Sequence, residues 1–310
     1  MDGAQQSPGF LHLRRLSGGA QWLHMCIKHK ETSEFLMSVA RLDELTVQAI
    51  VEEDTRSRVR FRKDGIMVLL KALHVRSDEM ARPEDMVSMR IWVGTSNIIT
   101  TREADVDPIR EVLRRLDANE GPKTPGDFLA EVVEIHLDEV DRYVEYIEDA
   151  VDRIEAMVVQ HKAEAACPNM ADTQTLISGF MRHLGPQKPV LEALSLTDHP
   201  ALSEPIKTRL DDGLNHLLRY LETLQNLRER IDILNDQVAR IQDRQLNRSS
   251  YAFAVAATIF LPLGFLTGLF GVNLAGIPLN QNPAGFWLFG LLCVLLTGVL
   301  IVLFRWRKWL

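Results

Sequence analysis

The sequence has few cysteines, no acidic residue near its C-terminus and no apolar stretch at its start. Its three cysteines, Cys26, Cys167 and Cys293, form no Cys-x-x-Cys pair. Neither a disulfide framework nor a thiolate zinc site is therefore indicated. The first 20 residues lack the basic start and apolar core of a signal peptide, so we expect the N-terminus to stay in the cytosol.

Acidic residues stop at Asp243, and the only charges after it belong to Arg244, Arg248, Arg305, Arg307 and Lys308. The whole chain carries −7 and the part after Asp243 carries five positive charges, so residues 1–243 carry −12. An acidic domain repels the phosphate backbone, which argues against a nucleic-acid partner. It attracts cations, although the same charge also serves solubility.

Signatures of enzymes and of preformed metal sites are also missing. The sequence contains no Walker phosphate loop, nucleophile elbow or His-Glu-x-x-His motif, so we expect neither an enzyme nor a resident cofactor. No two of the nine histidines are spaced i, i+3 or i, i+4. Tetrahedral zinc sites usually contain such pairs, and a zinc-storage site is therefore not indicated.

Two uncharged apolar segments, residues 251–270 and 284–304, predict transmembrane helices. Each has about 20 residues, the length that crosses roughly 30 Å of hydrocarbon. A pair of buried core helices is the alternative. The basic residues before the first segment and after the second place both termini in the cytosol and the intervening loop outside. The lipid bilayer is thus one expected partner.

A long stripe of apolar residues precedes the first span at steps of three and four. It consists of Leu210, Leu214, Leu217, Leu221, Leu224, Leu227, Ile231, Leu234, Val238 and Ile241. No proline occurs between residues 206 and 261, so we expect one helix over residues 206–270. One small domain cannot cover so long a helix, which favours self-association through the stripe. A helix packed only within its own subunit is the alternative.

The remaining segments predict an α/β domain that leads into helices. Apolar or β-branched runs at residues 59–61, 66–73, 87–93 and 97–101 predict strands, and residues 43–53 and 108–116 predict helices. Residues 127–162 and 173–196 also predict helices, the second bent or split by Pro186 and Pro189, with a turn at residues 167–169.

The fold class that we predict is an α/β cytosolic domain with a long helical stalk, followed by two transmembrane α-helices. The predicted parts are an N-terminal α/β cytosolic domain (1–125), a cytosolic helical region (126–205), a stalk helix (206–250), a first transmembrane helix (251–270), an external loop (271–283), a second transmembrane helix (284–304) and a basic cytosolic tail (305–310).

The tripeptide Gly271-Val272-Asn273 closes the first span and opens the external loop. In that place it resembles the Gly-Met-Asn signature of the CorA family of divalent-cation transporters, with valine at the middle position. The departure resembles the ZntB branch, the zinc transporters of the family. Residues 276–278 (Gly-Ile-Pro), 83–93 and 182–189 also match that branch, so the resemblance covers nearly the whole chain.

The resemblance implies a homopentamer with a funnel-shaped cytosolic domain, in a bacterial inner membrane. The first span of each subunit would line a central pore, and the transported ion would be zinc, with transport coupled to a proton gradient. A magnesium, cobalt or nickel channel of the same family is the alternative. A two-span membrane-anchored sensor or scaffold is a second one, although the chain offers only a 15-residue loop and six residues after Phe304.

The side chain of Asn273 offers a carbonyl oxygen and two N–H donors at the external mouth. A ring of five such amides could hold a hydrated ion weakly, which suits passage rather than storage. A helix cap is the alternative role for Asn273. Residues 271–285 contain no acidic side chain. Electrostatic capture of cations is therefore weak, which argues against a simple magnesium channel.

Helical spacing back from the signature predicts a pore-lining face. It consists of Gly271, Gly268, Gly264, Leu261, Ala257, Ala254, Ser250 and Asn247. Close helix packing is the alternative for the glycines, because Gly-x-x-x-Gly is a close-approach pattern. Leu261 is the only bulky member, and five copies would form a dry ring. It could instead face lipid or the second span, since Pro262 can rotate the face.

Overall fold

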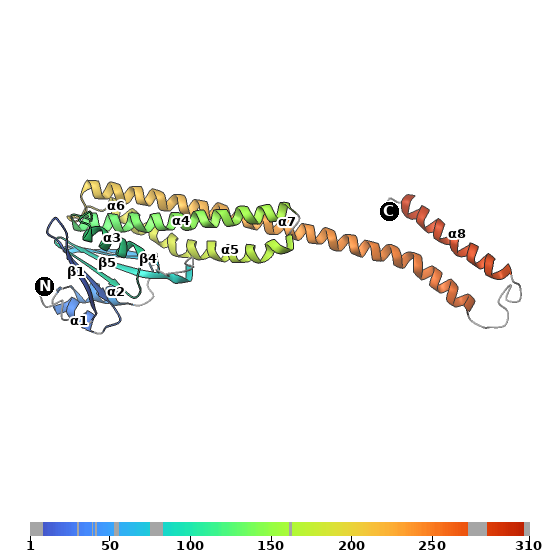
Figure 1. The fold of residues 1–310 in the computed structure, drawn as a ribbon, viewed down its shortest axis with the longest axis horizontal. Coiled ribbons are helices and arrows are strands. Elements are labelled where there is room, and N and C mark those ends of the chain that lie inside the picture. Colours follow the sequence, from blue (N-terminus) through green and yellow to red (C-terminus); the bar gives the residue numbers. More distant parts are fainter. Residues whose placement is uncertain are drawn as a thin grey trace. The chain divides into compact units, whose positions relative to one another are not determined.

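The structure is a computed structural model that describes residues 9–29, 31–38, 40, 42–52, 56–74, 83–160, 163–271 and 284–306 (Figure 1). The chain divides into two compact units, Met1–Asn235 and Asp236–Leu310. We describe each unit by itself. Helix α7 (Glu204–Gly271) contributes residues to both units.

The first unit contains a six-stranded sheet in the order β1-β2-β6-β5-β4-β3. The strands are β1 (Phe10–Arg15), β2 (Gln21–Cys26), β3 (Arg58–Phe61), β4 (Gly65–Leu73), β5 (Met86–Gly94) and β6 (Asn97–Arg102). Strands β2 and β6 are parallel, and the other neighbours are antiparallel. The four strands predicted from the sequence are confirmed as β3 to β6, whereas the sequence reading missed β1 and β2.

Helices cover both faces of this sheet (Figure 1). On one face, α1 (Glu31–Ser38) and α2 (Glu44–Val51) enclose a core that includes Trp92. Asp43 begins α2, because its carboxylate accepts a hydrogen bond from the Thr46 backbone N–H at 3.1 Å. On the other face lie α3 (Asp107–Asp117) and α4 (Pro125–Val159). There the ring centroids of Trp22 and Phe128 are 4.8 Å apart.

Helices α4, α5 (Ala163–Leu184) and the first part of α7 pack side by side in the first unit (Figure 1). The 3-10 turn η3 (Gly185–Gln187) separates α5 from α6 (Lys188–Leu196), so the split predicted at Pro186 and Pro189 is confirmed. The turn predicted at residues 167–169 is wrong, because Pro168 lies inside α5. Ala166 and Met170 are fully buried on either side of it, and this packing offsets the lost hydrogen bond.

The apolar stripe of α7 is buried within the chain itself. Between Leu210 and Leu234, the stripe residues Leu210, Leu217, Leu224, Leu227, Ile231 and Leu234 are at most 5% exposed. A Cβ added at Gly213 would meet the side chains of Leu137 and Val133 on α4 at 3.2 and 3.3 Å. The expectation that this part of the stripe is left for another copy is therefore wrong, because α4 and α5 are long enough to cover it.

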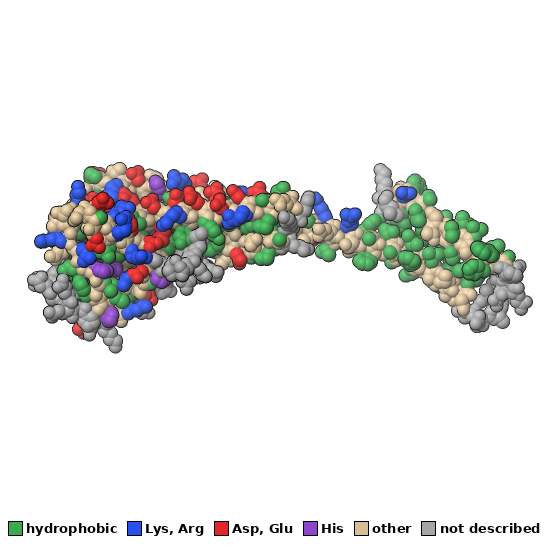
Figure 2. Space-filling view, in the orientation of Figure 1, with side chains coloured by type: hydrophobic (Ala, Val, Ile, Leu, Met, Phe, Trp, Pro, Cys, Tyr) green, Lys and Arg blue, Asp and Glu red, His purple; other side chains and the backbone are tan. Residues whose placement is uncertain are grey.

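The second unit contains the rest of α7 and helix α8 (Ala284–Trp306). Both helices are long and apolar enough to cross a membrane. They contact each other through Phe270 and Phe289, whose ring centroids are 5.1 Å apart. Figure 2 shows hydrophobic side chains over this unit, whereas acidic side chains gather along the helices of the first unit.

Candidate functional site

The eight predicted pore-lining residues lie on one exposed side of α7. Asn247, Ser250, Ala254, Ala257, Leu261, Gly264, Gly268 and Gly271 are all exposed in the chain. Helix α7 continues through Pro262 without a break. At about 100° per residue, the eight positions fall within roughly 120° of the helix circumference. The structure thus presents them together on one face, which we call the small-residue face.

The opposite side of the first span is the part that packs within the chain. Its partly buried residues are Val255, Ala256, Ile259, Pro262, Leu263 and Leu266. They lie about 180° from the small-residue face on the helical wheel. Leu261 is 74% exposed, so its side chain does not pack against the second span of its own chain. The choice between the pore and lipid for Leu261 stays a prediction.

Bulky side chains border the small-residue face on both edges. Phe253 and Phe260 lie along one edge, and Phe265 and Leu269 lie along the other, all at least 55% exposed. The face is therefore a shallow stripe between two rows of large apolar residues. When copies of such a helix converge, the small residues can approach an axis while the large ones fill the space between neighbours.

The signature tripeptide is only partly described. Gly271 is the last residue of α7 and is exposed. Val272 and Asn273 lie outside the described residues. The roles of Asn273 as a weak ligand for a hydrated ion, or as a helix cap, therefore stay predictions.

The spans carry no charge that could hold or repel an ion. Residues 251–304 contain no Asp, Glu, His, Lys or Arg. Any route through them is lined by backbone dipoles, hydroxyls and apolar groups. The hydroxyls of Thr258 and Thr267 donate to the carbonyls of Ala254 and Gly264 in their own helix, at 2.8 and 3.0 Å. These donors are thus already occupied.

The same helical count continues past Asn247 to two acidic residues that the sequence reading missed. Asp243 and Asp236 fall on the small-residue face, at about 0° and 20° from Leu261 on the helical wheel. Both are exposed, as is Arg240 close to the same line. Extending the spacing by about three more turns would have found them from the sequence.

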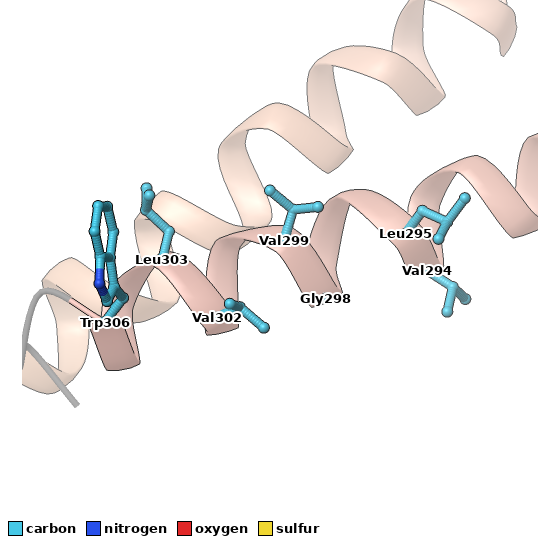
Figure 3. A pocket seen from close by; sticks show the side chains of 7 residues that line it. All are labelled: Val294, Leu295, Gly298, Val299, Val302, Leu303 and Trp306. Carbon is cyan, nitrogen blue, oxygen red and sulfur yellow. The ribbon is translucent and has the colours of Figure 1, made fainter.

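Helix α8 carries a shallow hollow lined by Val294, Leu295, Gly298, Val299, Val302, Leu303 and Trp306 (Figure 3). Only the indole of Trp306 contributes a polar side-chain atom. A surface of this composition suits contact with hydrocarbon and offers nothing to a hydrated cation.

The first unit offers no preformed metal centre in the ranges that the structure describes, since no three His, Cys, Asp or Glu side chains converge there. Two of its strongly perturbed groups are buried on α4. Burial lowers the pKa of His136 to about 4, although its Nε2 is 3.0 Å from Gln187 Oε1. Burial and then the neighbouring Asp107 raise the pKa of Glu139 to about 8.

Comparison with known proteins supports the family resemblance. The model of the family "CorA-like Mg2+ transporter protein" matches residues 17–307. The chain is 30% identical over 289 residues to the zinc transport protein ZntB of Yersinia enterocolitica, covering 93% of this chain and 88% of the relative. It is 31% identical over 296 residues to the divalent cation transporter CmaX of Pseudomonas aeruginosa, covering 93% and 87%.

Solved structures agree in fold. The full-length CmaX structure has a TM-score of 0.82 at 26% identity and covers 97% of this chain and 98% of that chain. The complete structure of the CorA magnesium transporter from Methanocaldococcus jannaschii has a TM-score of 0.79 at 18% identity, with 94% and 92% covered. The predicted α/β domain, long helix and two apolar helices are thereby confirmed as one known architecture.

Proposed function

Because the chain belongs to the CorA family of divalent-cation transporters, we propose that five copies form a pentamer that moves zinc across a bacterial inner membrane. The observation that carries the proposal is the small-residue face of α7, exposed on the side opposite α8. The zinc assignment is supported by 30% identity to ZntB over most of both chains. It is also supported by the valine in Gly271-Val272-Asn273.

The face would line the pore in three sections. Asn247 and Ser250 provide polar side chains at the cytosolic end. Leu261 provides a narrow apolar ring about halfway through the span, where a hydrated ion is excluded until the ring widens. The glycines Gly264, Gly268 and Gly271 let the helices approach closely toward the external mouth.

The ends of the pore would differ in charge. Asp243 and Asp236 place carboxylates at the cytosolic mouth, where they favour cations over anions. The external loop has no acidic residue, so the amide of Asn273 is the only side chain of the signature that could contact the hydrated ion. Such a mouth binds divalent ions weakly, and the ion keeps its water.

Coupling to a proton gradient is part of the proposal, and the sequence restricts how it could work. Residues 251–304 contain no carboxylate, imidazole or amine, so none of these groups carries protons within the spans. Protons would then move on water in the pore or be exchanged by groups of the cytosolic part.

A channel for magnesium, cobalt or nickel is the second candidate. The observation that favours it is the similarity to CmaX, whose name specifies only a divalent cation. The uncharged external loop argues against it, because a magnesium channel gains from acidic residues that concentrate the ion.

Reconstituted flux separates the candidates. The full-length chain in liposomes should take up zinc faster than magnesium, and an inwardly directed proton gradient should accelerate zinc uptake. Native mass measurement in detergent should give about five times 35.2 kDa. Magnesium flux above zinc flux, without an effect of the gradient, would favour the channel. A monomer or dimer that retains transport would contradict the pore altogether.

A further inference from the structure

A small polar pocket lies between α3 and the edge of the sheet in the first unit. His12 of β1 and His24 of β2 line it, together with Arg102 at the end of β6. Arg110 and apolar residues of α3 close the other side. The two imidazole rings are stacked, with centroids 6.2 Å apart and planes 6° from parallel.

His24 is held in one orientation by a buried hydrogen-bond chain. Trp22 Nε1 donates to Thr100 Oγ1 at 2.8 Å, and the same hydroxyl lies 2.7 Å from His24 Nδ1. The Thr100 hydroxyl accepts from Trp22. Every buried donor then has an acceptor if this hydroxyl donates its own hydrogen to His24 Nδ1. The neutral ring then carries its proton on Nε2. His24 is only 3% exposed, and no described residue bonds its Nε2.

Positive charges lie near both histidines of this pocket. Burial, then Arg102 and His12, lowers the pKa of His24 to about 3. Burial, then Arg14 and Arg102, also lowers the pKa of His12.

Carboxylates pair with the arginines at this pocket, but they do not occupy all of the guanidinium N–H donors. The ion pairs are Arg102 with Asp105, Arg110 with Asp107 and Arg14 with Asp117. A guanidinium has five N–H donors, and one carboxylate contact uses at most two of them. Arg110 keeps the most freedom, since its side chain is 58% exposed and its ion pair is long, at 3.6 Å.

We propose that this pocket binds a small inorganic anion of the size of chloride or phosphate. The anion would accept hydrogen bonds from His24 Nε2–H, from the guanidinium of Arg102 and from that of Arg110. A metal ion is disfavoured at the same place, although two histidines converge there. The tautomer turns an N–H rather than a lone pair toward the pocket, and two arginines repel a cation.

Binding of the anion is linked to the charge of His12. An anion beside the ring stabilises the imidazolium, so the anion raises the pKa of His12 and binds more tightly to its charged form. Affinity should therefore rise as the pH falls through the pKa of His12, which lies below the ordinary histidine value of 6.5. The charged and titratable groups that face the pair are Arg14, His24, Arg102, Asp105, Asp107, Arg110 and Asp117.

Chlorine NMR line broadening with the full-length protein in detergent tests the site, with sodium chloride as the probe and inorganic phosphate as competitor. The matched variants are Arg110→Gln and Arg114→Gln. Both arginines are exposed residues of α3 that pair with the acidic residue three positions earlier, and only Arg110 lines the pocket. Neither substitution changes the core, so both proteins should fold.

The proposal predicts saturable chloride broadening that grows as the pH falls from about 7 to about 5, through the lowered pKa of His12. Affinity should fall about tenfold in Arg110→Gln, the loss of one charge-assisted contact, and stay within about twofold of the parent in Arg114→Gln. Displacement of chloride by phosphate would identify the larger anion as the preferred ligand. Equal affinity in the two variants, or broadening that does not change with pH, would overturn the proposal.

Discussion

Arg209 of α7 donates two parallel hydrogen bonds to the carboxylate of Glu134 on α4, from Nε to Oε1 and from Nη2 to Oε2, both at 2.7 Å. A second carboxylate, that of Asp127, lies 3.5 Å from Nη1. The contact joins α4 to α7 one turn before Gly213, where the two helices approach closely. It therefore helps to set the register in which the apolar stripe of α7 is buried.

Replacing Arg209 with Lys should lower the free energy of unfolding of the first unit by about 1 kcal/mol, because lysine cannot form the two-pronged contact. The side chains are 35% and 40% exposed, so solvent screens the pair and salt should reduce the effect. Urea unfolding followed by tryptophan fluorescence measures it. Arg228→Lys, at an exposed arginine of the same helix, is the control. Equal effects of the two changes would reject the role of Arg209.

Glu139 makes stability depend on pH. Its side chain is 4% exposed, Oε2 has no partner among the described residues, and its pKa is raised to about 8. The folded state keeps the proton while the unfolded chain loses it near the model value of 4.5. Stability contributed by this group is thus present below pH 4.5 and lost as the pH rises to about 8.

Glu139→Gln keeps the shape and removes the titration. We expect the variant to melt at a higher temperature than the parent at pH 8 and at a similar temperature at pH 5. The expected curves differ because glutamine needs no proton to remain neutral. Glu148→Gln, at an exposed residue of the same helix, is the control. If the melting temperatures of parent and variant differ by the same amount at every pH from 5 to 8, the shifted pKa of Glu139 is rejected.

Asn273→Ala should lower zinc flux while pentamer yield stays near that of the parent. The change removes the amide that could contact the hydrated ion, and it leaves the helix and both spans intact. Asn280→Ala, in the same loop, is the control for a general effect on the loop. If Asn273→Ala transports zinc at the parent's rate, the side chain serves only as a helix cap.

Leu261→Ser should increase leak of ions through resting liposomes, because a ring of hydroxyls stays wet where a ring of leucines excludes water. Leu263→Ser is the control, since Leu263 is partly buried on the side away from the small-residue face. That control should lower protein yield and leave leak unchanged. Lower yield without leak in Leu261→Ser would place Leu261 against lipid.

The elements that could be predicted from the sequence are those with one strong local pattern of apolar residues. The spans, α4 and the long α7 follow from uninterrupted apolar patterns. Strands β1 and β2 were missed because His12, Arg14 and His24 interrupt their apolar pattern. His24 tolerates burial only because Thr100, in the parallel neighbour strand, meets its Nδ1. A partner 76 residues away along the chain is not visible in a local pattern.

The error about the apolar stripe has a similar cause. The apolar stripe itself was predicted correctly. The helix that packs against it was not, because residues 127–162 were not considered as its packing partner. In the structure, α4 and α5 bury the stripe as far as Leu234. The predicted pore-lining positions lie on one helix, where spacing is set by the backbone, so the sequence alone could place them on a common face. Their role in transport stays a prediction.

The most direct test of the proposed pore compares two neighbouring alanines in the full-length protein in its native oligomeric state. In a cysteine-free background, Ala257→Cys lies on the small-residue face and Ala256→Cys on the partly buried side. A membrane-impermeant thiol reagent should label position 257, and zinc should slow that labelling, whereas position 256 should stay unlabelled. Labelling at 256 in preference to 257 would contradict the assignment of this face to the ion route.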